Sequence, residues 1–361
     1  MRLLGQPEID DIARGSAVLG TGGGGDPYLG KLEAFEAIKL HGPFRLVEID
    51  ELDNDALVIF PFGIGSPVPF LERLTLKREL RVAYDAMQRW LGKPIGAIMS
   101  TEIGGMNSVI PFAVASELGL PVIDGDLMGR AYPEVQLVTL TLYGHSAAPI
   151  VVADSRGNSA VIDSVDNFWA ERLARPIAVE FGAIAGAFAF PITVKDLKIA
   201  GVLGSVSYAE RIGRAIREAQ TSHADPVNAV TDATNGFRIF DGRIVDVMRK
   251  TERGWALGET VIQGVGDYSG RRMIVRFQNE HLVAIEENVI VVSVPDLIAI
   301  LDTDRGDPIT TEQLRYGYQV SVVGIPCDSK WRTPAGIKLG GPRYFGYDIE
   351  FVPVEKRFGK Q

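Results

Sequence analysis

The chain has 361 residues, of which 46% are hydrophobic and 23% are charged, as is typical of a globular protein with a sizeable core. At about 150 residues per domain, this length suffices for two domains. The formal net charge of −9, with dispersed lysine and arginine, argues against nucleic acid or an anionic membrane as the main partner. The single cysteine, Cys327, excludes internal disulfides and fits a reducing compartment, so we expect a cytoplasmic protein.

The segment GTGGGGDP, at residues 20–27, is the most informative, because four consecutive glycines lose much backbone entropy on folding. Apolar residues recur at helical spacing on both sides, so we expect the glycines to join two helices. Asp26 and Pro27 predict the N-cap and first residue of the second helix, whose unpaired N–H groups suit an anion. The preceding helix and the missing Gly-Lys-Ser/Thr argue against a nucleotide-binding motif, so no nucleotide cofactor is expected.

Strand-like and helix-like segments then alternate. Apolar runs at 56–60, 95–99 and 121–123 predict buried parallel strands, and helices are expected at 70–91 and 109–118. The runs 138–142 and 150–153, with a turn at 155–158, are typical of antiparallel strands. Residues 1–166 therefore predict a three-layer α/β domain with a mostly parallel sheet.

The pattern changes in residues 167–361. Two helices, at 168–190 and 206–220, are expected to form a connector over about residues 167–225. The apolar window 177–190 within the first is too short to span a bilayer. Six short strand-like runs follow, at 237–240, 243–249, 272–278, 282–286, 289–293 and 319–324, with Asp241-Gly242 as a hairpin turn. They predict a β-rich C-terminal domain, either a barrel or a sandwich.

Polar residues follow the predicted strands of the first domain. Ligands bind outside the carboxyl ends of parallel strands, where Glu102, Asp124 and Asp126 are expected. We expect these three carboxylates to be catalytic, as general acids or bases. Each also has a structural alternative, since acidic residues in loops commonly serve turns and caps.

The substrate-binding residues are expected around the same edge. Arg130 is the natural partner of a substrate carboxylate, and Asn107 and Glu134 are expected beside it. The opposite wall is expected to be the polyglycine loop, whose backbone N–H groups would meet a carbonyl, carboxylate or oxyanion. Its residues are Gly22, Gly23, Gly24, Gly25 and Asp26. A flexible turn between two helices is the alternative for this loop.

A divalent metal ion, either Zn²⁺ or Mg²⁺/Mn²⁺, is a candidate cofactor, because carboxylates at a rim can supply oxygen ligands. Asp124, Asp126 and His145 are the candidate ligands. The four histidines lack the paired spacing that marks a zinc site. A mechanism with carboxylates alone therefore stands beside the metal hypothesis.

Several of these segments together resemble the S-methyl thiohydantoin desulfurase family. They are residues 20–27, 102–107, 124–126, 129–134, 279–280, 283–284, 294–297 and 341–348. The resemblance covers almost the whole chain and implies an α/β domain joined to a β-rich domain, in an enzyme or enzyme partner that acts on hydantoin-like rings. Family members occur beside, or fused to, hydantoinase- or oxoprolinase-type proteins, and zinc dependence is suggested for some relatives.

The expected function is hydrolysis of a cyclic amide or thioamide, with water activated by carboxylates or a metal and an oxyanion held by the polyglycine backbone. One alternative is a non-catalytic ligand-binding or accessory subunit of a hydantoinase- or oxoprolinase-type enzyme. Another is an enzyme that places a substrate phosphate on the polyglycine loop. The expected partners are a small-molecule substrate and a hydantoinase- or oxoprolinase-like protein, and the edge strands permit a homo-oligomer.

Overall fold

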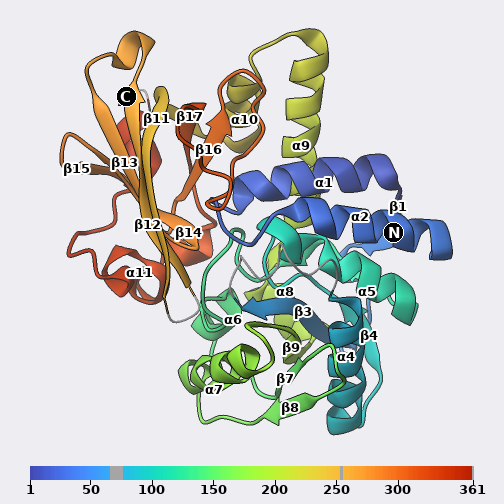
Figure 1. The fold of residues 1–361 in the computed structure, drawn as a ribbon. Coiled ribbons are helices and arrows are strands. Elements are labelled where there is room, and N and C mark those ends of the chain that lie inside the picture. Colours follow the sequence, from blue (N-terminus) through green and yellow to red (C-terminus); the bar gives the residue numbers. More distant parts are fainter. Residues whose placement is uncertain (66–75, 253–254, 360–361) are drawn as a thin grey trace.

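The computed structural model describes residues 1–65, 76–252 and 255–359 and contains two domains (Figure 1). The N-terminal α/β domain is built on an eight-stranded sheet of order β1-β2-β5-β4-β3-β9-β7-β8. Its strands are β1 (Arg2–Leu4), β2 (Phe44–Val47), β3 (Leu57–Gly65), β4 (Ile95–Ile98), β5 (Val122–Ile123), β7 (Ile150–Ala153), β8 (Ser159–Ile162) and β9 (Ile184–Thr193). The consecutive strands β2, β5, β4 and β3 are parallel, of which the apolar runs predicted β3, β4 and β5, and antiparallel strands flank the four on both sides.

The helices of this domain are α1 (Gln6–Leu19), α2 (Pro27–His41), α4 (Lys77–Leu91), α5 (Ile110–Leu118), α6 (Thr139–Leu142), α7 (Asn167–Glu180) and α8 (Val194–Ala200). The two helices predicted around the polyglycine loop are α1 and α2. The predicted cap is also confirmed, since the Asp26 carboxylate accepts a hydrogen bond from the Tyr28 N–H at 2.9 Å and Pro27 opens the helix. The start of the predicted helix 70–91, residues 70–75, lies outside the described residues.

The strand predicted at 138–142 is wrong, because this segment forms the short helix α6. Both the N–H and the hydroxyl of Thr139 donate to the carbonyl of Leu127, at 2.7 and 3.0 Å. These bonds tie the segment to the loop after β5 instead of to the sheet. Its apolar residues are buried by tertiary packing, which an apolar run alone does not distinguish from a strand.

The predicted helix 168–190 is also partly wrong. Helix α7 ends at Glu180, and β9 (Ile184–Thr193) enters the first sheet between β3 and β7. Gly182 and Ala183 have φ values of 100° and 67°, which end the helix. A Cβ at Gly186 would lie 2.8 Å from the Glu79 Cβ, so the small residues of β9 let α4 approach the sheet closely. The first sheet therefore extends past the expected domain boundary at residue 166.

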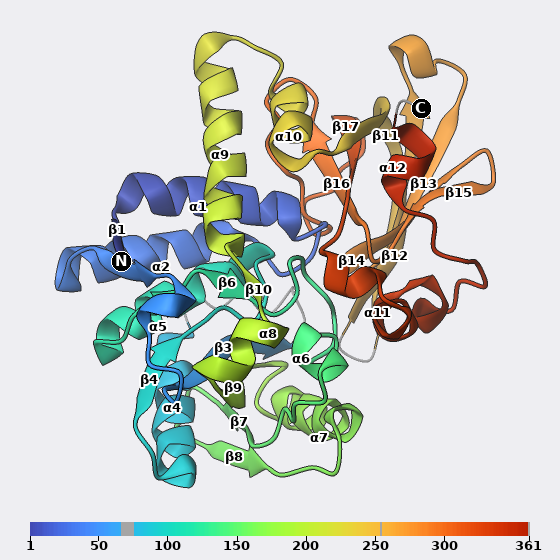
Figure 2. The same cartoon turned by 180° about the vertical axis from the view of Figure 1, so that it is seen from behind.

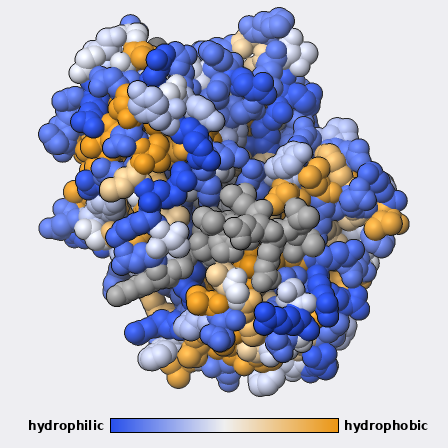
Figure 3. All heavy atoms as spheres, viewed as in Figure 1, coloured by the Kyte–Doolittle hydropathy of each residue, from blue (hydrophilic) through white to orange (hydrophobic). Residues whose placement is uncertain are grey.

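The C-terminal domain is an antiparallel seven-stranded sheet that curls into a half-barrel (Figure 1). In the order β15-β14-β13-β12-β11-β17-β16 it contains β11 (Phe237–Glu252), β12 (Trp255–Gly264), β13 (Arg272–Gln278), β14 (Glu280–Glu286), β15 (Val289–Ser293), β16 (Leu297–Asp302) and β17 (Gln319–Ile325). The face of the molecule in Figure 3 is largely hydrophilic, but hydrophobic side chains gather over this sheet. Two hydrophobic residues of the sheet, Met248 of β11 and Val289 of β15, are exposed.

The predicted hairpin at Asp241-Gly242 is wrong, because both residues lie inside the continuous strand β11. The first part of β11 pairs with β17 and the second with β12, and the two pairings overlap at Gly242 and Arg243. A Cβ at Gly242 would lie 2.5 Å from the Gln263 carbonyl oxygen. This glycine therefore allows close strand approach instead of a turn.

The remaining elements link and cover the two sheets. They are α9 (Ser205–Ser222), α10 (Pro226–Thr234), α11 (Pro334–Gly340), α12 (Val354–Phe358), the pair β6 (Gly125–Asp126) and β10 (Val202–Leu203), and the 3-10 turns Ile49–Glu51, Gly105–Ser108, Gly266–Tyr268, Ser329–Arg332 and Pro342–Phe345. No helix in the described ranges is long and apolar enough to cross a membrane.

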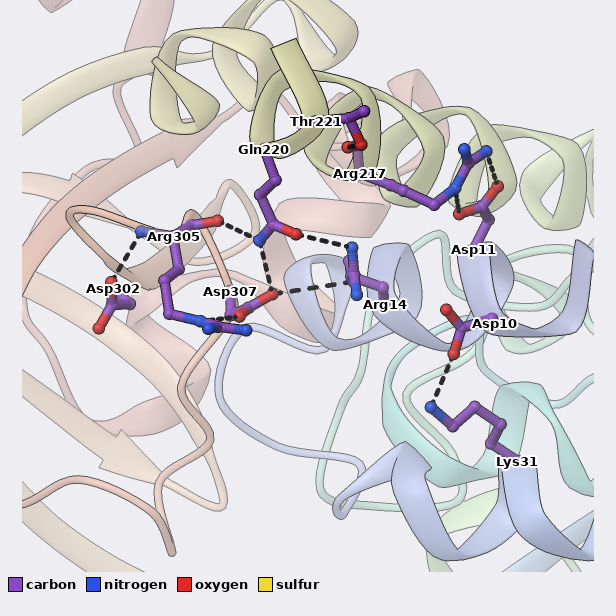
Figure 4. A network of polar contacts seen from close by, with 10 residues as sticks. All are labelled: Asp10, Asp11, Arg14, Lys31, Arg217, Gln220, Thr221, Asp302, Arg305 and Asp307. Carbon is purple, nitrogen blue, oxygen red and sulfur yellow. Dashed lines mark hydrogen bonds and ion pairs between the residues drawn. The ribbon is translucent and has the colours of Figure 1, made fainter. Parts of the chain in front are cut away.

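Polar contacts join the loop after β16 to α1 and α9 (Figure 4). Asp307 pairs with Arg14 of α1 at 3.7 Å and with Arg305 at 2.7 Å. Gln220 of α9 accepts from Arg14 at 3.3 Å and donates to the Arg305 carbonyl at 2.6 Å. The half-barrel is thus fixed to the helices that precede the polyglycine loop and link the domains.

Helices α1 and α9 cross (Figure 2). Each carries a glycine that approaches the backbone of the other, Gly15 of α1 and Gly213 of α9. A Cβ at Gly213 would lie 1.9 Å from the Asp11 carbonyl oxygen. We expect Gly213→Ala to lower the free energy of unfolding by about 3 kcal/mol, because backbone must shift. Gly30→Ala is the matched control: its Cβ would meet the flexible Met106 side chain at 3.2 Å, and alanine favours a helix interior. Urea unfolding of both variants tests this, and equal midpoints would contradict it.

Candidate active site

The polyglycine loop is held by other segments through its backbone carbonyls. The Thr21 carbonyl accepts from the His281 N–H at 2.7 Å, and the Gly22 carbonyl accepts from the Thr311 N–H at 2.8 Å. The Gly24 carbonyl accepts from the Met106 N–H at 2.9 Å. The loop is therefore an ordered part of the domain interface and not a flexible turn.

Close approach explains why these positions are glycine. A Cβ at Gly22, which has a φ of 84°, would lie 2.5 Å from the His281 ring. A Cβ at Gly23 would lie 2.2 Å from Oε1 of Glu280. Glu280 and His281 belong to β14, so the loop packs directly against the C-terminal sheet.

A cavity of about 80 Å³ lies beside this loop, and both domains line it. That volume holds several water molecules. Its polar lining residues are Thr101, Glu102, Asn107, Glu134, Arg175, Asn279 and Glu280, and its remaining lining residues are Gly24, Gly25, Phe62, Gly63, Ile64, Gly65, Met128, Tyr132, Pro133 and Val135. The cavity thus brings together the predicted residues Gly24, Gly25, Glu102, Asn107 and Glu134.

Glu102 is held in place by two neighbours. Nδ2 of Asn107 donates to its Oε1 at 2.6 Å, and the Tyr132 N–H donates to its Oε2 at 3.4 Å. Oδ1 of Asn107 in turn accepts from the Gly63 N–H at 2.9 Å, which fixes the orientation of the amide. Glu102 is only 6% exposed, and burial raises its pKa to about 8 despite hydrogen bonds that favour the charged form.

Glu280 is the second buried carboxyl group of the cavity and comes from the other domain. It is 2% exposed, and in the described part of the chain its Oε2 has no hydrogen-bond partner. Burial and the nearby charge of Glu102 raise its pKa well above the ordinary value, while Arg130 and the Gly24 N–H favour the charged form. The group that the glycine backbone meets here is therefore the carboxyl group of the protein's own Glu280.

Asp124 and Asp126 require a correction, because neither lines the cavity. The Asp124 carboxylate accepts from the N–H and the hydroxyl of Ser207, in the first turn of α9. Oδ2 of Asp126 accepts from three backbone N–H groups, those of Ile103, Met128 and Gly129, at 2.8 to 3.0 Å. Burial still raises the pKa of Asp126 to about 7. These bonds give both residues a structural role in positioning the loops.

Arg130 requires a similar correction. Its guanidinium is fully buried and donates to the carbonyls of Ala131 (2.9 Å), Pro295 (2.6 Å) and Asp296 (3.2 Å) and to the Thr21 hydroxyl at 3.2 Å. It also lies 4.3 Å from the centre of the Tyr132 ring. With its donors used in this way, Arg130 joins the two domains behind the cavity instead of meeting a substrate carboxylate.

Three predicted residues of the polyglycine loop lie away from the cavity, and a fourth predicted residue, Glu134, lines it with its carboxylate already bonded. Gly22 and Gly23 pack against β14 as described, and Asp26 caps α2 and accepts from Gln313 at 2.8 Å. Glu134 lines the cavity, but its carboxylate already accepts from Gln136 and from the Tyr344 hydroxyl, the latter at 2.7 Å.

The structure does not gather the candidate metal ligands. His145 lies in the loop after α6, where its carbonyl accepts from Asn167, whereas Asp124 and Asp126 are bonded within the protein. Across residues 1–65, 76–252 and 255–359, no group of three or more His, Cys, Asp or Glu side chains is arranged to hold a metal ion. We therefore build no step of the chemistry on a metal.

Four polar residues of the cavity lie outside the predicted site: Thr101, Arg175, Asn279 and Glu280. Arg175 of α7 pairs with Glu171 and donates to the Pro133 carbonyl at 3.0 Å. Glu280 lies on β14 of the second sheet, so the strand ends of the first sheet do not predict its position. In the sequence, the feature that points to Asn279 and Glu280 is the family resemblance, which includes this pair.

Gly23 offers a direct test of how the loop positions Glu280. We expect Gly23→Ala to fold, since the clash is with a side chain and not with backbone, but to displace the Glu280 side chain from Cγ to the carboxyl group. A displacement of about 1 Å in an active site can cost about 100-fold in rate. Turnover and melting temperature of this variant check the prediction. In a Glu280→Gln background the same substitution should have little further effect, and an equal further loss would contradict it.

Taken together, the fold and the site define a two-domain α/β protein with a buried pair of carboxyl groups at the domain interface. Residues 7–164 match the family described as "S-Me-THD-like, N-terminal domain", and residues 165–354 match "S-Me-THD-like, C-terminal domain". The chain therefore belongs to the S-Me-THD-like family, the S-methyl thiohydantoin desulfurase family that the sequence resembles.

A crystal structure of a protein from Chromobacterium violaceum has the same fold, with a TM-score of 0.84. The match covers 98% of this chain and 100% of that chain, at 20% sequence identity. A search among curated proteins gives no match.

Proposed function

We propose that the protein is a hydrolase of a cyclic amide or thioamide, with a hydantoin- or thiohydantoin-like ring as its substrate. The observation that carries this proposal is the pair Glu102 and Glu280, two buried carboxyl groups that line one cavity from two domains. Membership of the S-Me-THD-like family supports the choice of ring.

The two carboxyl groups can divide the roles of acid and base. Burial and mutual repulsion raise the pKa of both groups, that of Glu102 to about 8, so the pair holds at least one proton near pH 7 and its singly ionised form increases as the pH rises toward 8. Carboxyl groups with such separated roles are a recurring means of running acid and base chemistry together at neutral pH. Both residues therefore act in catalysis as a pair.

For an S-methyl thiohydantoin, the ionised carboxylate takes a proton from water, and the water oxygen bonds to the ring carbon that carries the sulfur. The carbon–sulfur bond then breaks, and the protonated carboxyl supplies the proton that leaves with methanethiol. One hydrogen of the water ends on the ring nitrogen and the other on the thiol, while the ring carbon becomes a carbonyl. The same groups would open a cyclic amide by protonating the departing nitrogen.

Release of methanethiol from S-methyl-2-thiohydantoin by the purified protein tests this function. We expect hydantoin and methanethiol in equal amounts, formed faster than in buffer alone. Binding of the ring without turnover of this substrate or of hydantoin would overturn the hydrolase assignment and favour a ligand-binding or accessory subunit. Metal analysis before and after dialysis against a chelator, paired with the same assay, tests the metal hypothesis separately.

A further inference from the structure

A single residue, Asn279, forms the tip of the hairpin between β13 and β14. Gln278 and Glu280 pair directly with each other, so Asn279 alone makes the connection. Its φ of 57° lies in the left-handed region, which asparagine tolerates better than most residues. A residue held in this region at the wall of a cavity is a common sign of function.

This backbone geometry places two successive side chains in one site. Neighbouring residues of a regular strand point to opposite faces of the sheet. Asn279 and Glu280 instead both line the cavity, because the positive φ interrupts the alternation. The hairpin tip is thus the part of the half-barrel that enters the site.

Three hydrogen bonds fix the orientation of Asn279. Its N–H donates to the Ala256 carbonyl at 2.8 Å, and its own carbonyl accepts from the Thr311 hydroxyl at 3.1 Å. The Ala256 N–H donates to Oδ1 at 2.8 Å. Because that N–H can only donate, Oδ1 must face it, and Nδ2 must point the other way.

Nδ2 is therefore a donor left without a partner. Asn279 is 8% exposed, and in the described part of the chain no acceptor meets Nδ2. Among the other cavity side chains with nitrogen donors, Asn107 donates to Glu102, and Arg175 uses Nε for Glu171 and Nη2 for the Pro133 carbonyl. Because Asn279 lines the cavity, this donor is available to an acceptor on a ligand bound there.

We propose that Asn279 is a substrate-binding residue whose Nδ2 donates a hydrogen bond to a carbonyl oxygen or a sulfur of the ring. This inference rests on the proposed function for the class of ring. A hydantoin-type ring carries such acceptors, and the carboxyl groups of Glu102 and Glu280 line the same cavity to meet its N–H groups and the attacking water.

The test compares binding of hydantoin and 2-thiohydantoin to the wild type and to Asn279→Asp by titration calorimetry. Aspartate keeps the oxygen that Ala256 binds and tolerates the positive φ, but it loses the donor. We expect binding at least 10-fold weaker, with an unchanged far-UV spectrum. Gln278→Glu, the same change one residue earlier and outside the cavity lining, should bind like the wild type. If Asn279→Asp fails to fold, Asn279→Gly, which suits the same φ, is measured instead and should show the same loss.

Equal affinity of the Asn279 variant and the wild type for both rings would overturn the assignment, as would a wild type that binds neither ring. A wild type that binds the rings but releases no methanethiol and opens no ring would overturn the proposed function instead. In that case the variant comparison still decides the role of Asn279.

Discussion

Glu280→Gln and Glu102→Gln are each expected to reduce turnover of S-methyl-2-thiohydantoin by about 100- to 10,000-fold, the range for loss of a general acid or base. Glutamine keeps the size and burial of each side chain but cannot exchange the proton. Because the two groups act as a unit, the double variant should be hardly slower than either single one. Steady-state kinetics of the three variants measure this.

Two control variants separate loss of catalysis from the general effects of replacing an acidic residue. Glu36→Gln, an exposed position on α2, should turn over like the wild type. Asp124→Asn should lower the melting temperature, because it weakens the bonds to Ser207, while the folded protein keeps its rate. Full activity of Glu280→Gln would remove Glu280 from the mechanism, and a dead but stable Asp124→Asn would restore Asp124 to it.

The raised pKa of Glu102 is expected to make the free energy of unfolding depend strongly on pH. Burial raises the pKa of Glu102 from 4.5 to about 8, so the folded state binds a proton that the unfolded state has already lost at neutral pH. The stabilising contribution of this protonated group is complete below pH 4.5 and is lost as the pH rises through about 8. Each such group changes the free energy of unfolding by at most about 1.4 kcal/mol per pH unit.

The window from pH 6.5 to 8 isolates this effect. Below it, His281 acts in the opposite direction, because burial lowers its pKa to about 4 and stability is lost as the pH falls from 6.5. Within the window we expect the wild type to lose stability with rising pH more steeply than Glu102→Gln in urea unfolding. Glu218→Gln, an exposed position on α9, should follow the wild type. Parallel curves for all three proteins would contradict the raised pKa of Glu102.

The sequence predicted the parallel strands, the helices around the polyglycine loop and the cap at Asp26, because these depend on local periodicity and capping chemistry. It failed where tertiary packing overrides local signals. The Ala/Gly-rich segment 184–193 suits a buried helix as well as a buried strand, and only its neighbours β3 and β7 make it a strand. The dipeptide Asp-Gly predicts a turn at Gly242, but this glycine lies within a strand and lets the neighbouring strand approach closely.

The candidate site was predicted only in part, because some of its residues depend on tertiary packing. Glu102, Asn107 and Glu134 follow strands of one sheet, so their common location could be inferred from the chain order. Asp124 was expected beside them, but its bonds to Ser207 depend on α9, about 80 residues later in the chain. Glu280 is contributed by the second domain, and no pattern within a single sequence places it against Gly23.

The protonation of the two carboxyl groups tests the central claim most directly. Carbon-13 NMR of protein labelled at glutamate side chains, titrated from pH 4 to 9, follows Glu102 and Glu280 once Glu102→Gln and Glu280→Gln have assigned their signals. We predict that both titrate above 4.5, that Glu102 does so near 8, and that each substitution lowers the pKa of the remaining partner, because a neighbouring charge has been removed. Two independent titrations near 4.5 would contradict the account of a coupled catalytic pair.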